Sequence, residues 1–488
     1  MSRKGYGIKK KGSEELVAKL REELTVMPKV NPTAPGANTV QPFPVYRENS
    51  TKLYVPIAFG YERFGEPAKN ELSGQHHAIC DRLVFKGSLR PDQDEPVAAF
   101  LASPRGGIIS LKCAAGKTVM ALYIACQIKQ KTLVVCHKNF LLDQWKERIN
   151  EFIPTASVGL IKAKKTDTDG HDIVMASLQS IAMKDYDPAI FHQFGMVIFD
   201  EAHHVAAQVF SQALPRVIAP VMMGLSATLD RKDGLRKVFE WSLGKPVYES
   251  KKRTDTDLDV RMIKYFVSDP TYSKVRTLWN GKACVPQMLN AICAYTPRDD
   301  IILNILADVL RKEPDRKTII LSDRRAHLTA LAKAIGERGL GTVGFYVGGM
   351  KQQALKESEG KDIILGTYTL VSEGFDVARL NTLVFASPIS SIEQSVGRIQ
   401  RQKQCDRQYI PLIIDIWDEF SVFRNQGFRR HKFYKSNNYS ITMLQVDSDG
   451  KVIPSHGGGD SDGDSGDVAA GGKGKGRNTV IEFIDDDD

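Results

Sequence analysis

The sequence lacks the features that define several protein classes. No apolar run approaches the roughly 20 residues that a membrane-spanning helix needs, and the basic start MSRKGYGIKKKGSEE is not followed by the apolar segment of a secretory signal. The seven cysteines are scattered and form no C-x-x-C pair, and no H-E-x-x-H segment occurs. These absences argue against a membrane protein, a disulfide framework and a zinc site, and they favour an intracellular protein.

The charge is distributed unevenly along the chain. The formal net charge is +9, but residues 457–488 carry nine acidic and three basic side chains; +9 overall and −6 in this segment leave +15 for the rest. A body this basic suits a polyanionic partner such as a nucleic acid. The charge alone is equally compatible with a solvated surface that binds no partner.

Short apolar runs that indicate buried strands alternate with helical patterns in two stretches of the chain. The first stretch contains GIISL, TLVVC, DIVMAS, MVIF and MMGLSA, and the second contains KTIILS, TVGFYV, DIILGT, NTLVFAS and YIPLIIDI. Runs that are apolar throughout are typical of parallel strands covered by helices on both faces. The pattern therefore predicts an α/β fold with two parallel-sheet domains in tandem.

Five regions follow from this pattern. We expect an N-terminal arm and accessory region (1–84), a first α/β domain (85–250), a bridging segment (251–300), a second α/β domain (301–445) and a low-complexity acidic tail (446–488). Within the first region, residues 1–12 are expected to form a flexible arm and SEELVAKLREEL a helix that begins after Ser13. The tail is rich in Gly, Asp and Ser and is expected to be disordered.

A strand followed by Gly-Lys-Thr suggests a phosphate-binding loop in IISLKCAAGKTVMALYIA, residues 108–125. Gly116 would let the backbone approach a phosphate closely, Lys117 would pair with the β- and γ-phosphates, and the Thr118 hydroxyl would reach Mg²⁺. Leu111 stands where the pattern G-x-x-x-x-G-K-[ST] has its first glycine. The segment by itself therefore leaves a nucleotide site undecided.

Two further segments carry side chains that such a site needs. Asp200 and Glu201 follow the run MVIF; one carboxylate can hold the hydration shell of Mg²⁺ and the other can polarise an attacking water. In SIEQSVGRIQRQ, Arg398 and Arg401 lie three apart, which predicts one helical face that could reach across a domain cleft to the γ-phosphate. In isolation, the first segment also fits a solvated loop and the second a basic surface helix.

Taken in order, the motifs resemble those of the superfamily 2 helicases and translocases, which have two RecA-like domains. LRPDQ resembles the segment before the phosphate loop, LKCAAGKT motif I, DEAH motif II, SAT motif III, GTYTLVSEGFD motif V and QSVGRIQR motif VI. LKCAAGKT and LDRKDG look most like the XPB-type transcription and repair helicases. FPVYRENSTKLYVPIAFGYERFG and FRRHKFYKSNNYSI resemble the late-transcription helicases of large DNA viruses, and the whole resemblance covers about residues 24–445.

The resemblance implies ATP and Mg²⁺ as cofactors and assigns a role to each motif residue. Catalysis would fall to Lys117, Asp200, Glu201, Gln394, Arg398 and Arg401, with Thr118 and Asp200 at Mg²⁺. ATP would be bound by Gln93 at the adenine, by Cys113, Ala114, Ala115, Gly116, Lys117 and Thr118 at the phosphates, and by Gly374 and Asp376. The nucleic acid would contact His137, Ser177, Gln179, Arg324 and Thr367, and His203, Ser226 and Thr228 would couple the two sites.

The resulting hypothesis is an ATP-dependent helicase or translocase that acts on DNA, largely independently of sequence, in viral transcription or repair. Partners would be DNA, with RNA as an alternative, and transcription machinery, but no membrane; a viral protein would act in the host cytoplasm, virion or nucleus. An RNA helicase and a weakly catalytic DNA-binding scaffold are the rival hypotheses. Three departures from the family pattern bear on activity: Lys112 in place of Pro, Ala114 in place of Gly, and Lys232 in place of Glu.

One basic segment has two interpretations. RNQGFRRHKFYK (424–435) mixes Arg and Lys with aromatic residues. It would either add phosphate contacts and base stacking or form a helix that packs its aromatic side chains on the second domain.

Overall fold

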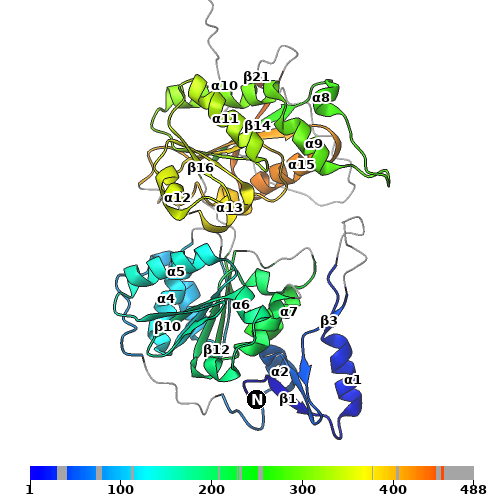
Figure 1. Ribbon diagram of the computed structural model, residues 1–488, viewed down its shortest axis with the longest axis vertical. Coiled ribbons are helices and arrows are strands. Elements are labelled where there is room, and N and C mark those ends of the chain that lie inside the picture. Colours follow the sequence, from blue (N-terminus) through cyan, green and yellow to red (C-terminus); the bar gives the residue numbers. More distant parts are fainter. Residues whose placement is uncertain are drawn as a thin grey trace, which may run out of the picture. The chain divides into compact units, whose positions relative to one another are not determined.

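The computed structural model describes residues 1–29, 41–72, 80–111, 115–206, 209–227, 229, 233–250, 257–375, 377–402, 406–446 and 452–454. The chain divides into two compact units, Met1–Lys251 and Lys252–Asp488 (Figure 1). Several predictions fall outside the described residues: the roles of Cys113, Ala114, Thr228 and Asp376, the departures at Lys112 and Lys232, and the disorder of residues 447–451 and 455–488. Within the tail expected to be disordered (446–488), residues 452–454 instead form a strand that pairs with residues 444–446, because their backbone groups complete the edge of a sheet.

An eight-stranded sheet with the order β13-β6-β12-β11-β7-β10-β8-β9 forms the centre of the first unit. All neighbouring strands pair in parallel except β8 and β9. The strands are β6 (Gly106–Ser110), β7 (Thr132–Cys136), β8 (Val158–Lys162), β9 (Lys165–Asp167), β10 (Ile173–Ser177), β11 (Met196–Phe199), β12 (Val221–Ser226) and β13 (Pro246–Glu249).

Both faces of this sheet are buried. Neighbouring residues of one strand, Ile108 and Ile109, belong to two different hydrophobic cores, as do Leu133 and Val134, because successive side chains of a strand point to opposite faces. The helices around the sheet are α3 (Pro91–Leu101), α4 (Lys117–Ile128), α5 (Asn139–Phe152), α6 (Leu178–Met183) and α7 (Arg236–Leu243), with the 3-10 helices η2 (Pro188–Gln193), η3 (Ala202–Ala206) and η4 (Phe210–Arg216).

The second unit repeats this architecture with the strand order β16-β17-β15-β18-β19-β14-β20-β21, parallel except for β20 with β21. Its strands are β14 (Asp259–Tyr265), β15 (Thr318–Leu321), β16 (Val343–Tyr346), β17 (Ile363–Gly366), β18 (Thr382–Phe385), β19 (Leu412–Asp418), β20 (Ser440–Val446) and β21 (Val452–Pro454). Its helices are α8 (Pro270–Ser273), α9 (Val285–Cys293), α10 (Thr296–Lys312), α11 (Arg325–Glu337), α12 (Gln352–Glu359), α13 (Tyr368–Gly374), α14 (Glu393–Val396) and α15 (Ser421–Ser436). The predicted α/β fold with two parallel-sheet, RecA-like domains is confirmed.

The expected bridging segment is part of the second unit wherever the structure describes it. Residues 259–265 form β14, which lies between β19 and β20 in the sheet, and α8, α9 and the start of α10 follow. The apolar pattern of β14 is interrupted by Arg261 and Lys264, which are only partly buried, so the sequence did not indicate a strand within a sheet. Among the described residues, no helix is long and apolar enough to cross a membrane.

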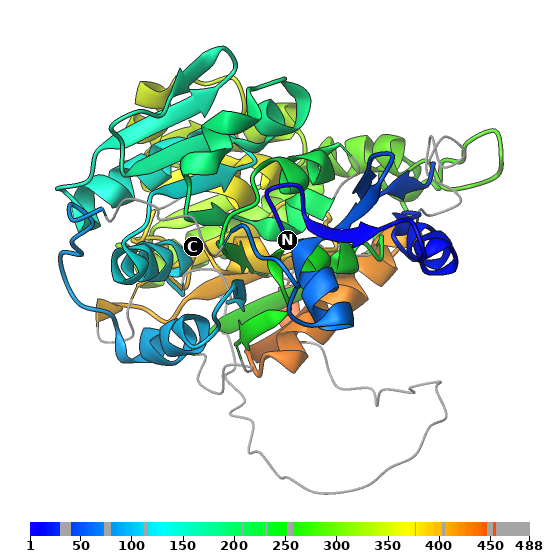
Figure 2. The same cartoon turned by 90° about the horizontal axis from the view of Figure 1, so that it is seen from below.

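The N-terminal residues fold against the first unit instead of forming the expected flexible arm. β1 (Tyr6–Lys9) pairs with β5 (Lys52–Val55), which also pairs with β4 (Arg47–Glu48), and α1 (Glu14–Glu23) and α2 (Ile57–Phe64) accompany this small sheet (Figures 1 and 2). β2 (Thr25–Val26) pairs with β3 (Phe43–Pro44). The Arg3 guanidinium donates hydrogen bonds to the carbonyls of His192, Phe194 and Ile218, at 2.8, 3.1 and 2.5 Å.

Replacing Arg3 tests whether this segment is an integral part of the first unit. Arg3→Ala would leave partly buried carbonyls without their donor, and we expect the free energy of unfolding to fall by about 1–3 kcal/mol. Urea unfolding followed by circular dichroism measures the change. The neighbouring exposed residue provides the control, Lys4→Ala, which should unfold like the wild type. Identical curves for both variants would show that the segment contributes nothing to stability.

Candidate active site

The sheet order brings three predicted motifs of the first unit to one edge. β12 lies between β6 and β11, and parallel pairing sets Ser110 beside Ser226 and Phe199 beside Gly224. The loops that follow these three strands therefore leave the sheet at the same edge, which is where parallel α/β sheets bind ligands. Lys117, Asp200 and Ser226 follow or end these strands.

The phosphate loop ends in a glycine whose backbone conformation strongly favours glycine. Gly116 has a φ of +82°, and a Cβ atom there would lie 2.2 Å from Nε2 of Gln93. Directly after it, Lys117 begins the 12-residue helix α4, with Thr118 second, so backbone N–H groups point towards the loop as a phosphate cradle requires. The Lys117 ammonium donates to the carbonyl of Leu111 at 3.1 Å.

The position of the missing first glycine does not need glycine. Leu111 is 6% exposed and packs in the same core as Ile109 and Met120. It is not among the residues with a positive φ, so a side chain causes no backbone strain there. Leu111 therefore extends the core to the start of the loop.

Gln93, which is predicted to contact the adenine, is hydrogen-bonded to the phosphate loop in this structure. Its side-chain oxygen accepts from the Arg90 backbone N–H at 3.0 Å, and its Nε2 donates to the Ala115 carbonyl at 3.1 Å. The Arg90 guanidinium donates to the same carbonyl at 2.8 Å. Because Gln93 is only 3% exposed and both of its polar groups are used, its contact to the adenine stays a prediction.

The two acidic residues of the DEAH segment have different environments. Asp200 is buried, and its oxygens accept from the Trp145 indole at 2.8 Å and from the Glu201 N–H at 3.0 Å. Burial, followed by the charge of Glu201, raises the pKa of Asp200 to about 6, while Trp145 and Lys117 oppose this shift. Glu201 has a φ of +49°, a strained backbone of the kind found at functional sites.

A histidine connects the DEAH segment to the end of β12. Nδ1 of His203 lies 3.0 Å from the Ser226 hydroxyl and 3.5 Å from a carboxylate oxygen of Glu201. His203 thus contacts both Glu201, which follows β11, and Ser226, the last residue of the neighbouring strand β12. The structure brings together the predicted coupling residues His203 and Ser226.

His137, predicted to contact nucleic acid, belongs to a stack of three imidazole rings. Its ring stacks on His204 with centroids 4.0 Å apart, and His204 lies 4.3 Å from His203. Both ring nitrogens of His137 are buried without a hydrogen-bond partner. Burial, then the neighbouring His204, lowers the pKa of His137 to about 3, so its ring is neutral at pH 7.

The other predicted nucleic-acid contacts also follow strand ends within their own units. Ser177 ends β10, beside Cys136 of β7, and Gln179 follows it with an exposed side chain. In the second unit, Arg324 and Thr367 follow the paired strands β15 and β17. The Arg324 guanidinium donates to the Asn290 side chain at 2.6 Å.

Motif VI of the second unit differs from the prediction. α14 contains Gln394 but ends at Val396, so Arg398 and Arg401 do not share a helical face. Gly397 follows, and the next N–H groups, of Arg398 and Ile399, bond three residues back instead of four. Gly397 itself keeps helical dihedrals (φ −59°, ψ −17°) and donates to the carbonyl of Glu393 four residues back, so helical hydrogen bonding stops only after it. Arg398 is buried and donates to the carbonyl of Phe375 at 2.9 Å, one residue after Gly374 at the end of α13.

The side chains at the edge of the first sheet fit a magnesium ion held with a nucleotide. Within the described residues, no group of three His, Cys, Asp or Glu side chains could hold a metal by itself. Mg²⁺ prefers oxygen ligands and is bound by one or two protein groups together with phosphates and waters. The Asp200 carboxylate and the Thr118 hydroxyl supply such oxygens.

The chain is similar to several known proteins. Residues 86–231 match the family described as type III restriction enzyme, res subunit. The chain is 32% identical over 457 residues to the Acanthamoeba polyphaga mimivirus protein named "Putative ATP-dependent RNA helicase L396", covering 91% of this chain and 87% of the relative. It is 26% identical to "Putative helicase 161L" of Invertebrate iridescent virus 6, over 72% and 82% of the two chains. "Probable helicase D10" of Escherichia phage T5 is 27% identical, over 69% and 73%.

A solved structure shares the fold. A fragment of a putative HsdR subunit of a type I restriction enzyme from Vibrio vulnificus superposes with a TM-score of 0.54 at 17% identity, covering 76% of this chain and 72% of that one. Fold and motifs define a two-domain, nucleotide-dependent motor. The chain belongs to the superfamily 2 helicases, a class of ATP-hydrolysing enzymes, together with its mimivirus relative.

Trp145 is the site residue that the sequence motifs did not reveal, and its role can be measured. Trp145→Phe removes a hydrogen bond to a carboxylate, worth about 1.5–3 kcal/mol. We expect the Mg²⁺ concentration for half-maximal ATPase activity to rise roughly tenfold or more. Trp241→Phe, where the ring packs on Phe59 away from Asp200, is the control. An unchanged Mg²⁺ midpoint in Trp145→Phe would exclude this role.

The lowered pKa of His137, whose ring nitrogens are buried, predicts a pH dependence of stability. Because the pKa of His137 in the folded protein lies below its ordinary value of 6.5, the unfolded chain takes up this proton first as the pH falls. This residue should thus lower the free energy of unfolding by about 2 kcal/mol between pH 7 and pH 5. His137→Phe, which keeps a stacking ring, should show a correspondingly smaller loss in urea unfolding. His192→Phe, outside the stack, should lose as much stability as the wild type.

Proposed function

We propose that the chain is an ATP-driven nucleic-acid helicase or translocase that acts on DNA in viral transcription or repair. One observation supports this above the others: a buried aspartate, a neighbouring glutamate and the lysine of a phosphate loop meet at one edge of a parallel sheet. Asp200 is close enough to Lys117 for the lysine charge to affect its pKa. A buried carboxylate with a raised pKa at such an edge is typical of a catalytic site.

In the proposed mechanism, the first unit binds and activates the nucleotide. Lys117 and the N–H groups at the start of α4 bind the phosphates, and Asp200 and Thr118 hold Mg²⁺, which neutralises charge on the phosphates. Glu201 orients and polarises the attacking water. His203, through its contact with Ser226, couples the ATP site to the nucleic-acid site. Arg398 and Arg401 of the second unit act on the γ-phosphate as arginine fingers supplied by the same chain, and Gln394 approaches the γ-phosphate and its water.

We further propose that the strand track consists of groups at the carboxyl edges of the two sheets. Ser177, Gln179, Arg324 and Thr367 offer hydroxyl, amide and guanidinium groups that suit phosphates better than base edges, so binding would be largely independent of sequence. We propose that His137 supports this track indirectly, because its ring nitrogens are buried in the imidazole stack.

The XPB-type motifs and the viral relatives support a role in transcription or repair in a virus-infected cell, with transcription machinery as the partner. RNA is the second candidate substrate, because the mimivirus relative and those of African swine fever virus are named as ATP-dependent RNA helicases. A weakly catalytic scaffold is the least favoured alternative. A decayed site usually loses a catalytic residue, whereas Lys117, Asp200, Glu201, Gln394, Arg398 and Arg401 are all present.

An ATPase assay with added polynucleotides tests the proposal. We expect hydrolysis to rise with DNA, and Glu201→Gln to lower the stimulated rate by about 100-fold or more, the usual contribution of general-base catalysis. Glu249→Gln, an exposed residue of the same unit, is the matched control. Greater stimulation by RNA would favour the second candidate. No stimulation by any polynucleotide would exclude a motor, and equal rates for wild type and Glu201→Gln would favour the scaffold.

A further inference from the structure

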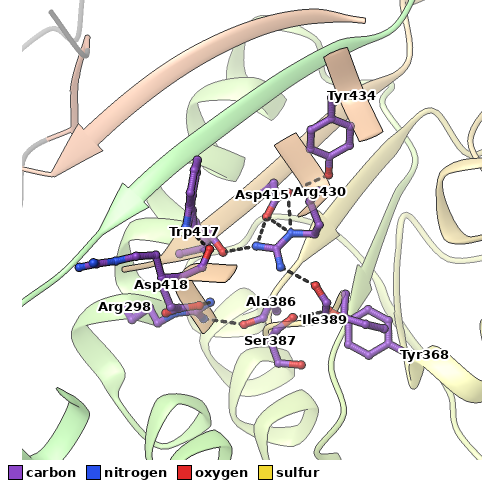
Figure 3. Close-up of polar contacts among 12 residues, drawn as sticks. Arg298, Tyr368, Ala386, Ser387, Ile389, Asp415, Trp417, Asp418, Arg430 and Tyr434 are labelled. Carbon is purple, nitrogen blue, oxygen red and sulfur yellow. Dashed lines mark hydrogen bonds and ion pairs between the residues drawn. The ribbon is translucent and has the colours of Figure 1, made fainter. Parts of the chain in front are cut away.

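Three buried side chains hold the backbone that leads into motif VI. This backbone, residues 386–392, connects β18 to α14 and is called the motif VI leader below. Its carbonyls at Ala386, Ser387 and Ile389 accept hydrogen bonds from the Arg298 guanidinium, the Tyr368 hydroxyl and the Arg430 guanidinium, each at 2.5 Å (Figure 3). The three donors come from α10, α13 and α15.

Each guanidinium is fixed in turn by a carboxylate of β19. Nε and one terminal nitrogen of Arg298 donate to the two oxygens of Asp418, at 2.7 and 3.0 Å. Nε of Arg430 donates to Asp415 at 2.9 and 3.0 Å, and a terminal nitrogen donates to the Ile416 carbonyl at 3.0 Å. All four charged side chains are at most 1% exposed.

Two tyrosines complete the carboxylate shells. The Tyr434 hydroxyl donates to Asp415 and the Tyr272 hydroxyl to Asp418, both at 2.7 Å. Asp415 and Asp418 are three residues apart in one strand, so their side chains leave opposite faces of the sheet. The leader is therefore held from both faces at once.

The helix that carries Arg430 is built to lie close to β19. A Cβ atom on Gly427 would lie 2.1 Å from the Trp417 ring, so only glycine permits this approach. Arg430 and Tyr434 are buried while Phe428 of the same helix is 55% exposed. The basic segment 424–435 thus follows the packing interpretation at Arg430 and Tyr434 and is not wholly a nucleic-acid surface.

Stability alone does not explain these ion pairs. Replacing a buried ion pair by apolar residues of similar volume is often neutral or stabilising, because two charges must be desolvated. What apolar side chains cannot provide is a directed donor to a particular carbonyl. Here each guanidinium directs one terminal nitrogen to a carbonyl of the leader, immediately before Gln394, Arg398 and Arg401.

We propose that Arg298 and Arg430 are positioning residues that set the catalytic groups of motif VI. This inference rests on the proposed function, in which those groups act on the γ-phosphate. The clamped leader continues into a segment whose apolar residues Ile392, Val396 and Ile399 are each 1% exposed. A displacement of the backbone at Ala386 or Ile389 therefore also displaces Arg398 and Arg401.

Arg316 provides a matched control within the same unit. It is 5% exposed and also donates to backbone carbonyls, those of Asn381 and Ile410, at 3.3 and 3.0 Å. These carbonyls lie just before β18 and β19, at the opposite edge of the sheet from the leader. Arg316→Lys therefore perturbs a buried guanidinium of similar kind without touching motif VI.

The experiment compares the affinities of the full chain, saturated with polynucleotide, for ADP and for ADP with aluminium fluoride, which mimics the transferring phosphoryl group. Arg430→Lys and Arg298→Lys keep the positive charge. They remove the planar guanidinium that donates both to a carboxylate of β19 and to a carbonyl of the leader. We expect ADP–aluminium fluoride to bind at least tenfold more weakly and ADP to stay within twofold. Arg316→Lys should leave the ratio of the two affinities unchanged, even if the substitution changes the unfolding temperature of the protein.

Two further variants make every outcome decisive. Tyr434→Phe, a milder change that removes one hydrogen bond from Asp415, should weaken ADP–aluminium fluoride binding two- to fivefold, and it replaces Arg430→Lys if that variant fails to fold. Arg401→Ala tests the proposed function itself. If Arg401→Ala weakens binding of the analogue but the clamp variants match Arg316→Lys, the positioning inference is overturned and the proposed function stands. If Arg401→Ala also binds the analogue normally, both are overturned.

Discussion

Burial of a parallel sheet on both faces is the constraint on which the rest of this protein depends. Strands such as β6, β7 and β10 are buried along their whole length, so they have little room for polar side chains. Polar chemistry is therefore confined to the ends of the strands. In the first unit, the parallel order of β6, β12 and β11 then gathers the phosphate loop, the DEAH segment and Ser226 at one edge.

At that edge, several buried polar groups have a partner. Asp200 accepts from Trp145, Gln93 is bonded at both ends, and His203 lies between Glu201 and Ser226. Such networks are rigid because an unsatisfied buried polar group costs about 1–3 kcal/mol. Rigidity is what a phosphate site needs, since its donors must be in place before the nucleotide binds.

The second unit uses the same principle with charges in place of neutral donors. The carboxylates of Asp415 and Asp418 lie inside an otherwise apolar strand, which is tolerable only because Arg430 and Arg298 pair with them. These pairs fix the backbone between β18 and α14 at the carboxyl edge of the sheet. Both units thus place their polar machinery at the same edge of similar sheets by different chemistry.

The sequence by itself determined the fold class and the positions of the motifs. Apolar runs and turn residues are local features, so strands such as β7, β11 and β15 and the start of α4 after Gly116 followed from short segments. It also determined the superfamily, because six motifs in order leave little freedom. Strands with mixed composition, such as β14, were missed because their burial depends on neighbours far away in the chain.

Only the tertiary structure decided which side chains support the site. No sequence motif marks Trp145 as a site residue, and its indole has a role only because the fold places Asp200, which follows β11, beside it. Arg298 and Asp418 are 120 residues apart, and nothing in the local pattern of either predicts the other. Motif VI showed the opposite error: a helical spacing in the sequence was not realised, because the N–H groups of Arg398 and Ile399 bond three residues back instead of four. Contacts between distant segments are set by packing, which a linear pattern does not contain.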